Sequence, residues 1–95
     1  MDRITEKQLR SLVDHINKLT GNAPAPYTHN STGIHANIGN YFLEYAYNGI
    51  NLVRMCSEGG GISQPLGGGF HTKRELYEKL HAFILGIETG KELKD

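Results

Sequence analysis

Residues 41–55, YFLEYAYNGINLVRM, constrain the fold more than any other part of the sequence. Apolar and polar side chains alternate here on both sides of Asn48-Gly49, a dipeptide typical of the two-residue turn of a β-hairpin. With the turn at these two residues, Tyr45 faces Leu52 across the hairpin. The pattern therefore predicts two antiparallel strands with one apolar face.

A second turn signal, Gly39-Asn40, adds residues 34–38 as a preceding strand and predicts a three-stranded meander over residues 34–56. Because a one-residue slip would reverse the faces, agreement between the two turns predicts which face is buried. Both turns place the same residues on one face: Ile34, Ala36, Ile38, Tyr41, Leu43, Tyr45, Tyr47, Ile50 and Leu52. The opposite face carries Phe42, Val53 and Met55, which we expect to form a partner or dimer surface or to lie under the glycine-rich loop.

Amphipathic helices are predicted over residues 5–20 and 73–88, one on each side of the meander. Each begins with a capping box, formed by Thr5 with Gln8 and by Thr72 with Glu75. Each carries an apolar stripe at helical spacing: Leu9, Leu12, Val13, Ile16 and Leu19, then Leu76, Leu80, Phe83, Ile84 and Ile87. The order α-β-β-β-α predicts a single α+β domain over residues 1–95, a two-layer sandwich with both helices on one face of the sheet.

Composition limits the classes of partner. Ten basic and ten acidic residues cancel, and a protein without a basic excess is not expected to bind nucleic acid or membranes broadly.

The single cysteine, Cys56, excludes an intrachain disulfide. No apolar run approaches membrane-spanning length, and the charged first residues lack the apolar region of a signal peptide. We therefore expect a soluble, cytoplasmic protein, located in the host cytoplasm if a phage encodes it.

The segment SEGGGISQPLGGGF, residues 57–70, contains half of the twelve glycines. Glycine in ordered structure costs about 0.5–1 kcal/mol relative to alanine, so such a run needs a reason. The segment within 57–71 is interpreted as a flexible loop or flap, as a nest of backbone N–H groups that holds an anion, or as a loop whose backbone approaches a partner closely. A short further strand within residues 62–70 is compatible with each interpretation.

An anion site is predicted where this segment enters the second helix, because a helix N-terminus attracts anions through its free N–H groups and its dipole. Arg54, the central arginine of a charge-poor region, is expected to pair with a ligand, a partner protein or an internal carboxylate such as Glu58. The candidate ligand-binding residues are Arg54, Gly59, Gly60, Gly61, Gln64, Gly68, Gly69, His71, Thr72, Lys73 and Arg74.

Catalytic and metal-binding patterns are not found in the sequence. The five histidines show no ligand spacing typical of a metal site, and nothing local marks Cys56 as a nucleophile. No pair of carboxylates stands out in the charge-poor centre for acid–base work. We expect a protein without catalytic residues, metal or cofactor.

The stretch from ANIGNY through LVRM and the glycine-rich loop to TKREL and its helix resembles small uncharacterised phage and prophage proteins. This resemblance covers most of the chain and implies a phage accessory role, often the inhibition or sequestration of a host component. The order of elements also resembles the double-stranded RNA-binding domain, in which a Gly-rich loop and a basic helix start contact phosphates. Gly67 to Gly69 and Thr72-Lys73-Arg74 match that pattern loosely, whereas Tyr77 replaces a further basic residue.

Together these features predict a phage-type binding protein that sequesters or inhibits a host component, with a nucleotide-like anion as ligand. A protein–protein inhibitor that uses the outer sheet face or the glycine-rich loop is the alternative, and a double-stranded RNA-binding module is the second. A homodimer is compatible with each of the three.

Overall fold

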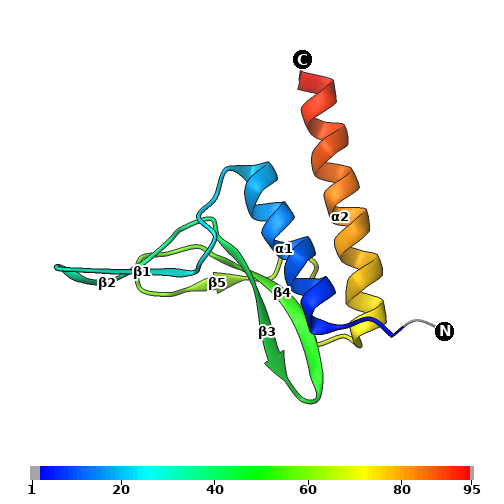
Figure 1. The fold of residues 1–95 in the computed structure, drawn as a ribbon, viewed down its shortest axis with the longest axis horizontal. Coiled ribbons are helices and arrows are strands. Elements are labelled where there is room, and N and C mark those ends of the chain that lie inside the picture. The colour runs from blue at the N-terminus through cyan, green and yellow to red at the C-terminus, as the bar shows by residue number, and fades with distance from the viewer. Residues whose placement is uncertain (1–2, 95) are drawn as a thin grey trace.

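The computed structural model describes residues 3–94, and it is an α+β fold as predicted (Figure 1). In the described residues, α1 and α2 pack beside each other, and two small antiparallel sheets complete the fold. One sheet has the strand order β3-β4-β5 and the other is the hairpin β1-β2. The elements are α1 (Glu6–Thr20), β1 (Tyr27–Asn30), β2 (Gly33–Ala36), β3 (Tyr41–Ala46), β4 (Gly49–Met55), β5 (Ile62–Ser63) and α2 (Lys73–Lys94).

Both helices begin where the capping boxes predict. The Thr5 hydroxyl accepts the Gln8 N–H, and the Gln8 side chain accepts the Thr5 N–H in return. At its other end α1 stops at Gly21, which adopts the left-handed conformation with φ 71°. The second helix continues to Lys94 instead of ending at residue 88. Its last turns contain two Glu and two Lys residues, which favour helix, and they project beyond the rest of the molecule (Figure 1).

The hairpin of β3 and β4 has the predicted faces but a different register. Its turn residues are Tyr47 and Asn48, with φ 52° and 59°, so Tyr45 lies opposite Ile50 and not opposite Leu52. Gly49 belongs to β4, where it pairs with Ala46, and a Cβ at this position would lie 2.7 Å from the Cβ of Phe70. Glycine is thus needed for a close approach and not for the turn. Since each residue's partner moves by two positions, the inward and outward faces are unchanged.

The predicted pairing of residues 34–38 with β3 is wrong. β2 pairs with β1, which lies in the stretch expected to be an extended connector. Asn37 holds this arrangement, since its backbone N–H donates to Pro26 O and its side chain to Ala25 O. Gly39 and Asn40 instead bond to the backbone of Met55 and extend the end of β3 along β4. β5 completes the three-stranded sheet, and it lies within residues 62–70, where a short further strand is compatible with the sequence.

The hairpin β1-β2 is a projecting arm. It extends away from the helices and from the larger sheet (Figure 1), and almost all of its residues are exposed. Ile34 is 65% exposed and Ile38, just after the arm, is 55% exposed. A lone two-stranded hairpin is marginally stable in water. The arm therefore adds little to the folded core.

The core lies between the two helices and the inward face of β3 and β4. Its buried members are Leu9, Val13, Ile16, Ile50, Leu52, Leu76, Leu80 and Ile84.

On the opposite face of the sheet, Val53 and Met55 are fully buried and Phe42 is half-buried. Val53 and Met55 are therefore not accessible to a partner, so the predicted partner surface is wrong for these two residues, and burial, the other expectation for this face, is what the structure has. No helix in residues 3–94 is long and apolar enough to cross a membrane.

Candidate functional site

The glycine-rich segment returns along β4 through two hydrogen-bonded turns. In the first, which joins β4 to β5, Gly60 N–H donates to Ser57 O and Gly61 N–H to the Ser57 hydroxyl. Cys56 N–H then bonds to Gly61 O at 2.9 Å and closes the turn. The first glycine triplet is thus part of a hydrogen-bonded hairpin connection.

The second turn lies between Gln64 and Gly67, and it carries the chain away from β4 for a few residues. Asn51, fully buried, fills the gap: its side-chain oxygen accepts the Leu52 N–H at 2.9 Å, and its amide donates to Gly67 O at 3.3 Å. The chain meets β4 again at His71, which exchanges two backbone hydrogen bonds with Ile50. The Asn51 side chain thus provides hydrogen-bond partners where the chain leaves β4, because buried backbone groups need partners.

The predicted ligand residues do not come together. Arg54 lies opposite Ser63 near the end of β4, with its guanidinium 5.8 Å from the centre of the Tyr41 ring. His71 and Lys73 lie by the start of β4, where His71 pairs with Ile50. The first glycine triplet belongs to the turn beyond Arg54, and the second precedes His71. One anion cannot contact both ends of this strand.

The first turn of α2 contains an anionic side chain that caps the start of the helix. The Glu75 carboxylate accepts the Thr72 N–H at 2.9 Å, and this hydrogen bond lowers the pKa of Glu75. The hollow of about 360 Å³ beside Lys73 and His71 is lined by a further carboxylate, Glu6. The buried Nε2 of His71 has no hydrogen-bond partner among the described residues. Glu75 therefore already occupies one of the N–H groups that an anion at this helix start would use.

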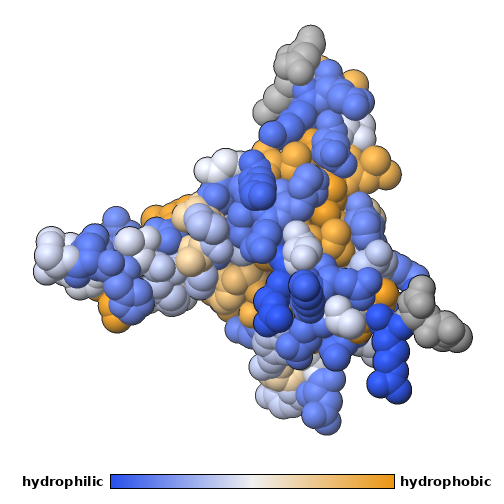
Figure 2. Space-filling view, in the orientation of Figure 1, coloured by the Kyte–Doolittle hydropathy of each residue, from blue (hydrophilic) through white to orange (hydrophobic). Residues whose placement is uncertain are grey.

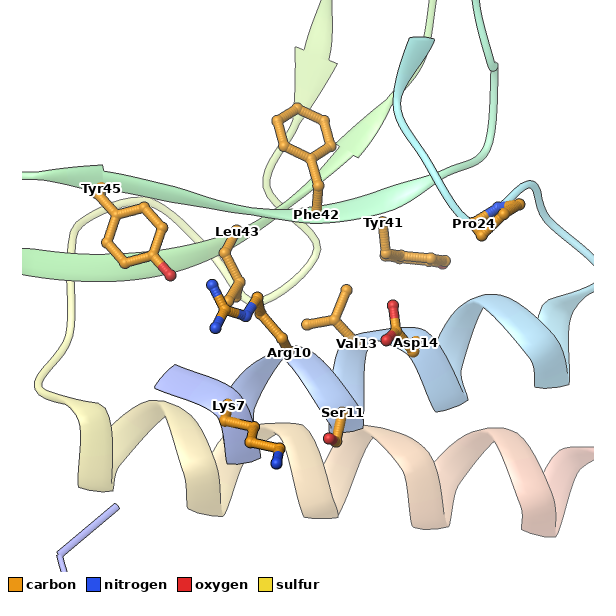
Figure 3. Close-up of a pocket in the computed structure, with 10 residues that line it drawn as sticks. All are labelled: Lys7, Arg10, Ser11, Val13, Asp14, Pro24, Tyr41, Phe42, Leu43 and Tyr45. Atoms are coloured by element: carbon orange, nitrogen blue, oxygen red, sulfur yellow. The ribbon is translucent and has the colours of Figure 1, made fainter. Parts of the chain in front are cut away.

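A larger groove, of about 490 Å³, lies between α1 and β3 (Figure 3). Its polar side chains come from α1, and its aromatic and apolar side chains come mostly from β3. The lining residues are Lys7, Arg10, Ser11, Val13, Asp14, Pro24, Tyr41, Phe42, Leu43 and Tyr45. The groove therefore combines cationic side chains with aromatic surface, a composition that is typical of binding sites for anionic molecules.

The groove is closed at one end by Asn17, which is only 2% exposed. Its side-chain amide donates to Tyr41 O at 2.9 Å, and its side-chain oxygen accepts the Tyr41 N–H at 2.8 Å. The side chain thus pairs with the edge of β3 as a neighbouring strand would. These two hydrogen bonds fix α1 against β3 at this point.

Charged side chains line the open part of the groove. Arg10 reaches from α1 toward Leu43 and Tyr45, whereas Asp14 lies below Tyr41 near Pro24 (Figure 3). Tyr45 is 50% exposed. Its partial burial and, to a smaller extent, the charge of Glu6 raise its pKa, whereas the charge of Arg10 lowers it. Arg10 is therefore close enough to act electrostatically on groups bound at Tyr45.

Sequence reasoning missed this groove. Lys7, Arg10 and Asp14 resemble an ordinary solvated helix face, although their spacing does place them on one side of α1. Asn17, within the apolar stripe and four residues after Val13, is the signal that could have drawn attention to the contact with β3. In the described part of the chain, no group of three or more His, Cys, Asp or Glu side chains could hold a metal ion.

Figure 2 shows one face of the molecule, with hydrophilic surface over most of the body and apolar surface between the helices and on the arm. Comparison with known protein families, curated proteins and solved structures finds no match to this chain. The resemblance to small phage proteins therefore stays a prediction.

Proposed function

We propose that this protein is a non-catalytic binding protein that captures an anionic ligand in the groove between α1 and β3. The observation that carries the proposal is the position of Arg10, which reaches over an open groove toward the half-exposed ring of Tyr45. The biological role that fits is the one implied by the phage resemblance, the sequestration or inhibition of a host component. This keeps the predicted class of ligand but moves its site away from the glycine-rich segment.

Charge and shape support this location over the start of α2. Lys7 and Arg10 line the groove together with the carboxylate of Asp14, and Glu6 lies next to Tyr45, whereas at the α2 start Glu75 already accepts the Thr72 N–H. A guanidinium can form two parallel hydrogen bonds to a carboxylate or phosphate, and an adjacent aromatic ring excludes water from them. Such charge-assisted bonds are the strong ones in binding sites.

Nuclear magnetic resonance of the ¹⁵N-labelled protein tests the proposal with three probes: inorganic phosphate, ATP and an acidic peptide pool. We expect chemical-shift changes at residues 7–14 and 41–45 with at least one probe. Arg10→Gln should weaken that binding about tenfold, as expected for one charged hydrogen-bond donor. Lys18→Gln, a charge change elsewhere on α1, should leave binding unchanged. Shifts confined to the start of α2, or no shift with any probe at millimolar concentration, would refute the groove as the site.

A second candidate, a protein–protein inhibitor, is favoured by the arm. Ile34 on the hairpin and Ile38 just after it are both more than half exposed, and neither belongs to the core. This replaces the outer sheet face as the contact surface. If the arm binds a host protein, Ile34→Asp should abolish a one-to-one complex measured by native mass spectrometry, and Ser31→Asp at the exposed turn of the same hairpin should not.

Double-stranded RNA binding stays a weaker alternative, since the matching residues Lys73 and Arg74 stand in a chain with zero net charge. Retention on a duplex RNA column at moderate salt tests it directly, and elution in the column flow-through would exclude this alternative.

A further inference from the structure

The outer edge of β3 offers a row of backbone groups to a ligand. β3 is an outer strand of its sheet, and in residues 3–94 no strand pairs with its far edge. In an antiparallel pair, every second residue turns its N–H and C=O away from the neighbouring strand. Which residues of β3 do so decides what the groove can bind.

The hydrogen bonds of Asn17 settle this alternation. Asn17 contacts both the N–H and the C=O of Tyr41 from outside the sheet, so the outward-facing residues of β3 are Tyr41, Leu43 and Tyr45. The other side of the sheet agrees. Ile50, the partner of Tyr45, exchanges its backbone bonds with His71 and not with β3. Beyond the Asn17 contact, Leu43 and Tyr45 thus point donors and acceptors toward the groove side.

We infer that the groove binds an extended peptide, which adds to β3 as a new outer strand and directs an acidic side chain toward Arg10 and Lys7. This rests on the proposed function and names the ligand class for the same site. Addition of a strand to an exposed edge provides affinity through main-chain hydrogen bonds, and the groove provides selectivity through alternate side chains.

The length of the free edge sets the size of the peptide. Asn17 blocks the edge at Tyr41, and the hairpin turn ends it at Tyr47, so about five residues can pair at ~3.3 Å each. Only every second peptide side chain faces α1, and the charged groups there are Lys7, Arg10 and Asp14, with Glu6 next to Tyr45. A single acidic residue opposite Leu43 would reach Arg10 and stay clear both of Asp14, which lies below Tyr41, and of Glu6, which lies next to Tyr45 (Figure 3).

An edge of this kind favours a peptide over a nucleotide. Strand pairing needs donors and acceptors that alternate along the ligand at strand spacing, which a peptide backbone supplies and a nucleotide does not. An unpaired edge is also a liability in a folded protein, and natural proteins usually protect it with charges, bulges or a covering element. Among residues 3–94, Asn17 covers the Tyr41 end of β3 in this way.

Selection from a displayed library of random ten-residue peptides tests the inference. With the full-length protein we expect enriched peptides that share one acidic position within an alternating, β-branched pattern free of proline. Arg10→Glu should change the preferred residue at that position from acidic to basic. Lys18→Glu, on the same helix but outside the groove, should select the same acidic sequences as the unaltered protein. Enriched peptides without an acidic position, or an unchanged preference in Arg10→Glu, would overturn the inference.

The best enriched peptide is then synthesised with single N-methyl groups. Methylation of nitrogens that pair with β3 should weaken binding about tenfold or more per site, whereas methylation of the alternate, outward-facing nitrogens should not. Binding should also slow hydrogen exchange at the amides of Leu43 and Tyr45. If the peptide binds without either effect, or if only ATP or phosphate binds with the same dependence on Arg10, strand addition is overturned while the groove keeps its function. If no peptide, ATP or phosphate binds, both proposals fail.

Discussion

Replacing Asn17 by alanine should lower the free energy of unfolding by about 2–3 kcal/mol. Asn17 makes two hydrogen bonds, of 2.9 and 2.8 Å, with the backbone of Tyr41 in a partly buried place. Each such bond contributes about 1 kcal/mol net, and a backbone group left without a partner adds a desolvation cost. A domain of this size is stable by only about 5–14 kcal/mol, so the loss is a large fraction of the total.

Urea denaturation followed by circular dichroism measures this loss, and native-state hydrogen exchange reports the Tyr41 amide separately. Asn17→Ala should speed exchange at Tyr41. Asn17→Asp keeps an acceptor for the Tyr41 N–H and should leave that amide protected, although it removes the donor to the carbonyl. Lys18→Ala, an exposed neighbour, should stay within about 0.5 kcal/mol of the unaltered protein. A loss below about 0.5 kcal/mol in Asn17→Ala, with Tyr41 still protected, would refute the role given to this side chain.

Three further predictions concern the turn, the second helix and the arm. Gly49→Ala should cost about 1–3 kcal/mol in urea denaturation, because the new methyl group would lie 2.7 Å from a neighbouring Cβ, whereas Gly59→Ala meets nothing within 4 Å and should be nearly neutral. The pKa of Glu75 is lowered in the folded state, chiefly by the hydrogen bond from the Thr72 N–H. The contribution of Glu75 to stability is therefore present above its ordinary pKa of 4.5 and is lost as the pH falls through the lower pKa of the folded state. Acid titration of stability should therefore be shallower in Glu75→Gln; an unchanged slope would contradict this. Replacing residues 28–35 by Asn-Gly should change the free energy of unfolding by less than about 1 kcal/mol, because the arm buries no core side chain, and loss of cooperative unfolding would count against this.

Local signals predicted the elements well, and long-range contacts decided the rest. The capping residues Thr5 and Thr72 act within three residues of chain, so their effect can be inferred from sequence alone. The strand pairing of residues 33–36 could not be inferred in this way. It depends on Asn37, whose contacts with Ala25 and Pro26 compete with the pairing that Gly39-Asn40 indicated.

The candidate site was not predicted because it forms between segments far apart in the chain. Arg10 and Tyr45 each look ordinary in sequence, and only the packing of α1 beside β3 brings them to one groove. Conversely, the residues that seemed to form a site, Arg54 and Lys73, lie by opposite ends of β4. The glycine-rich segment between them has a structural role, since it returns the chain along β4 in two tight turns.

The two helices and the alternation of side chains along β3 and β4 could be predicted from the chain alone. These follow from periodicity and from capping, both of which are local properties of the chain. Only the tertiary structure decided the register of the hairpin, the partner of β2 and the position of the groove. Each depends on a close approach between distant segments, such as Gly49 with Phe70 or Asn17 with Tyr41, and the free energy of such contacts exists only once the chain has folded.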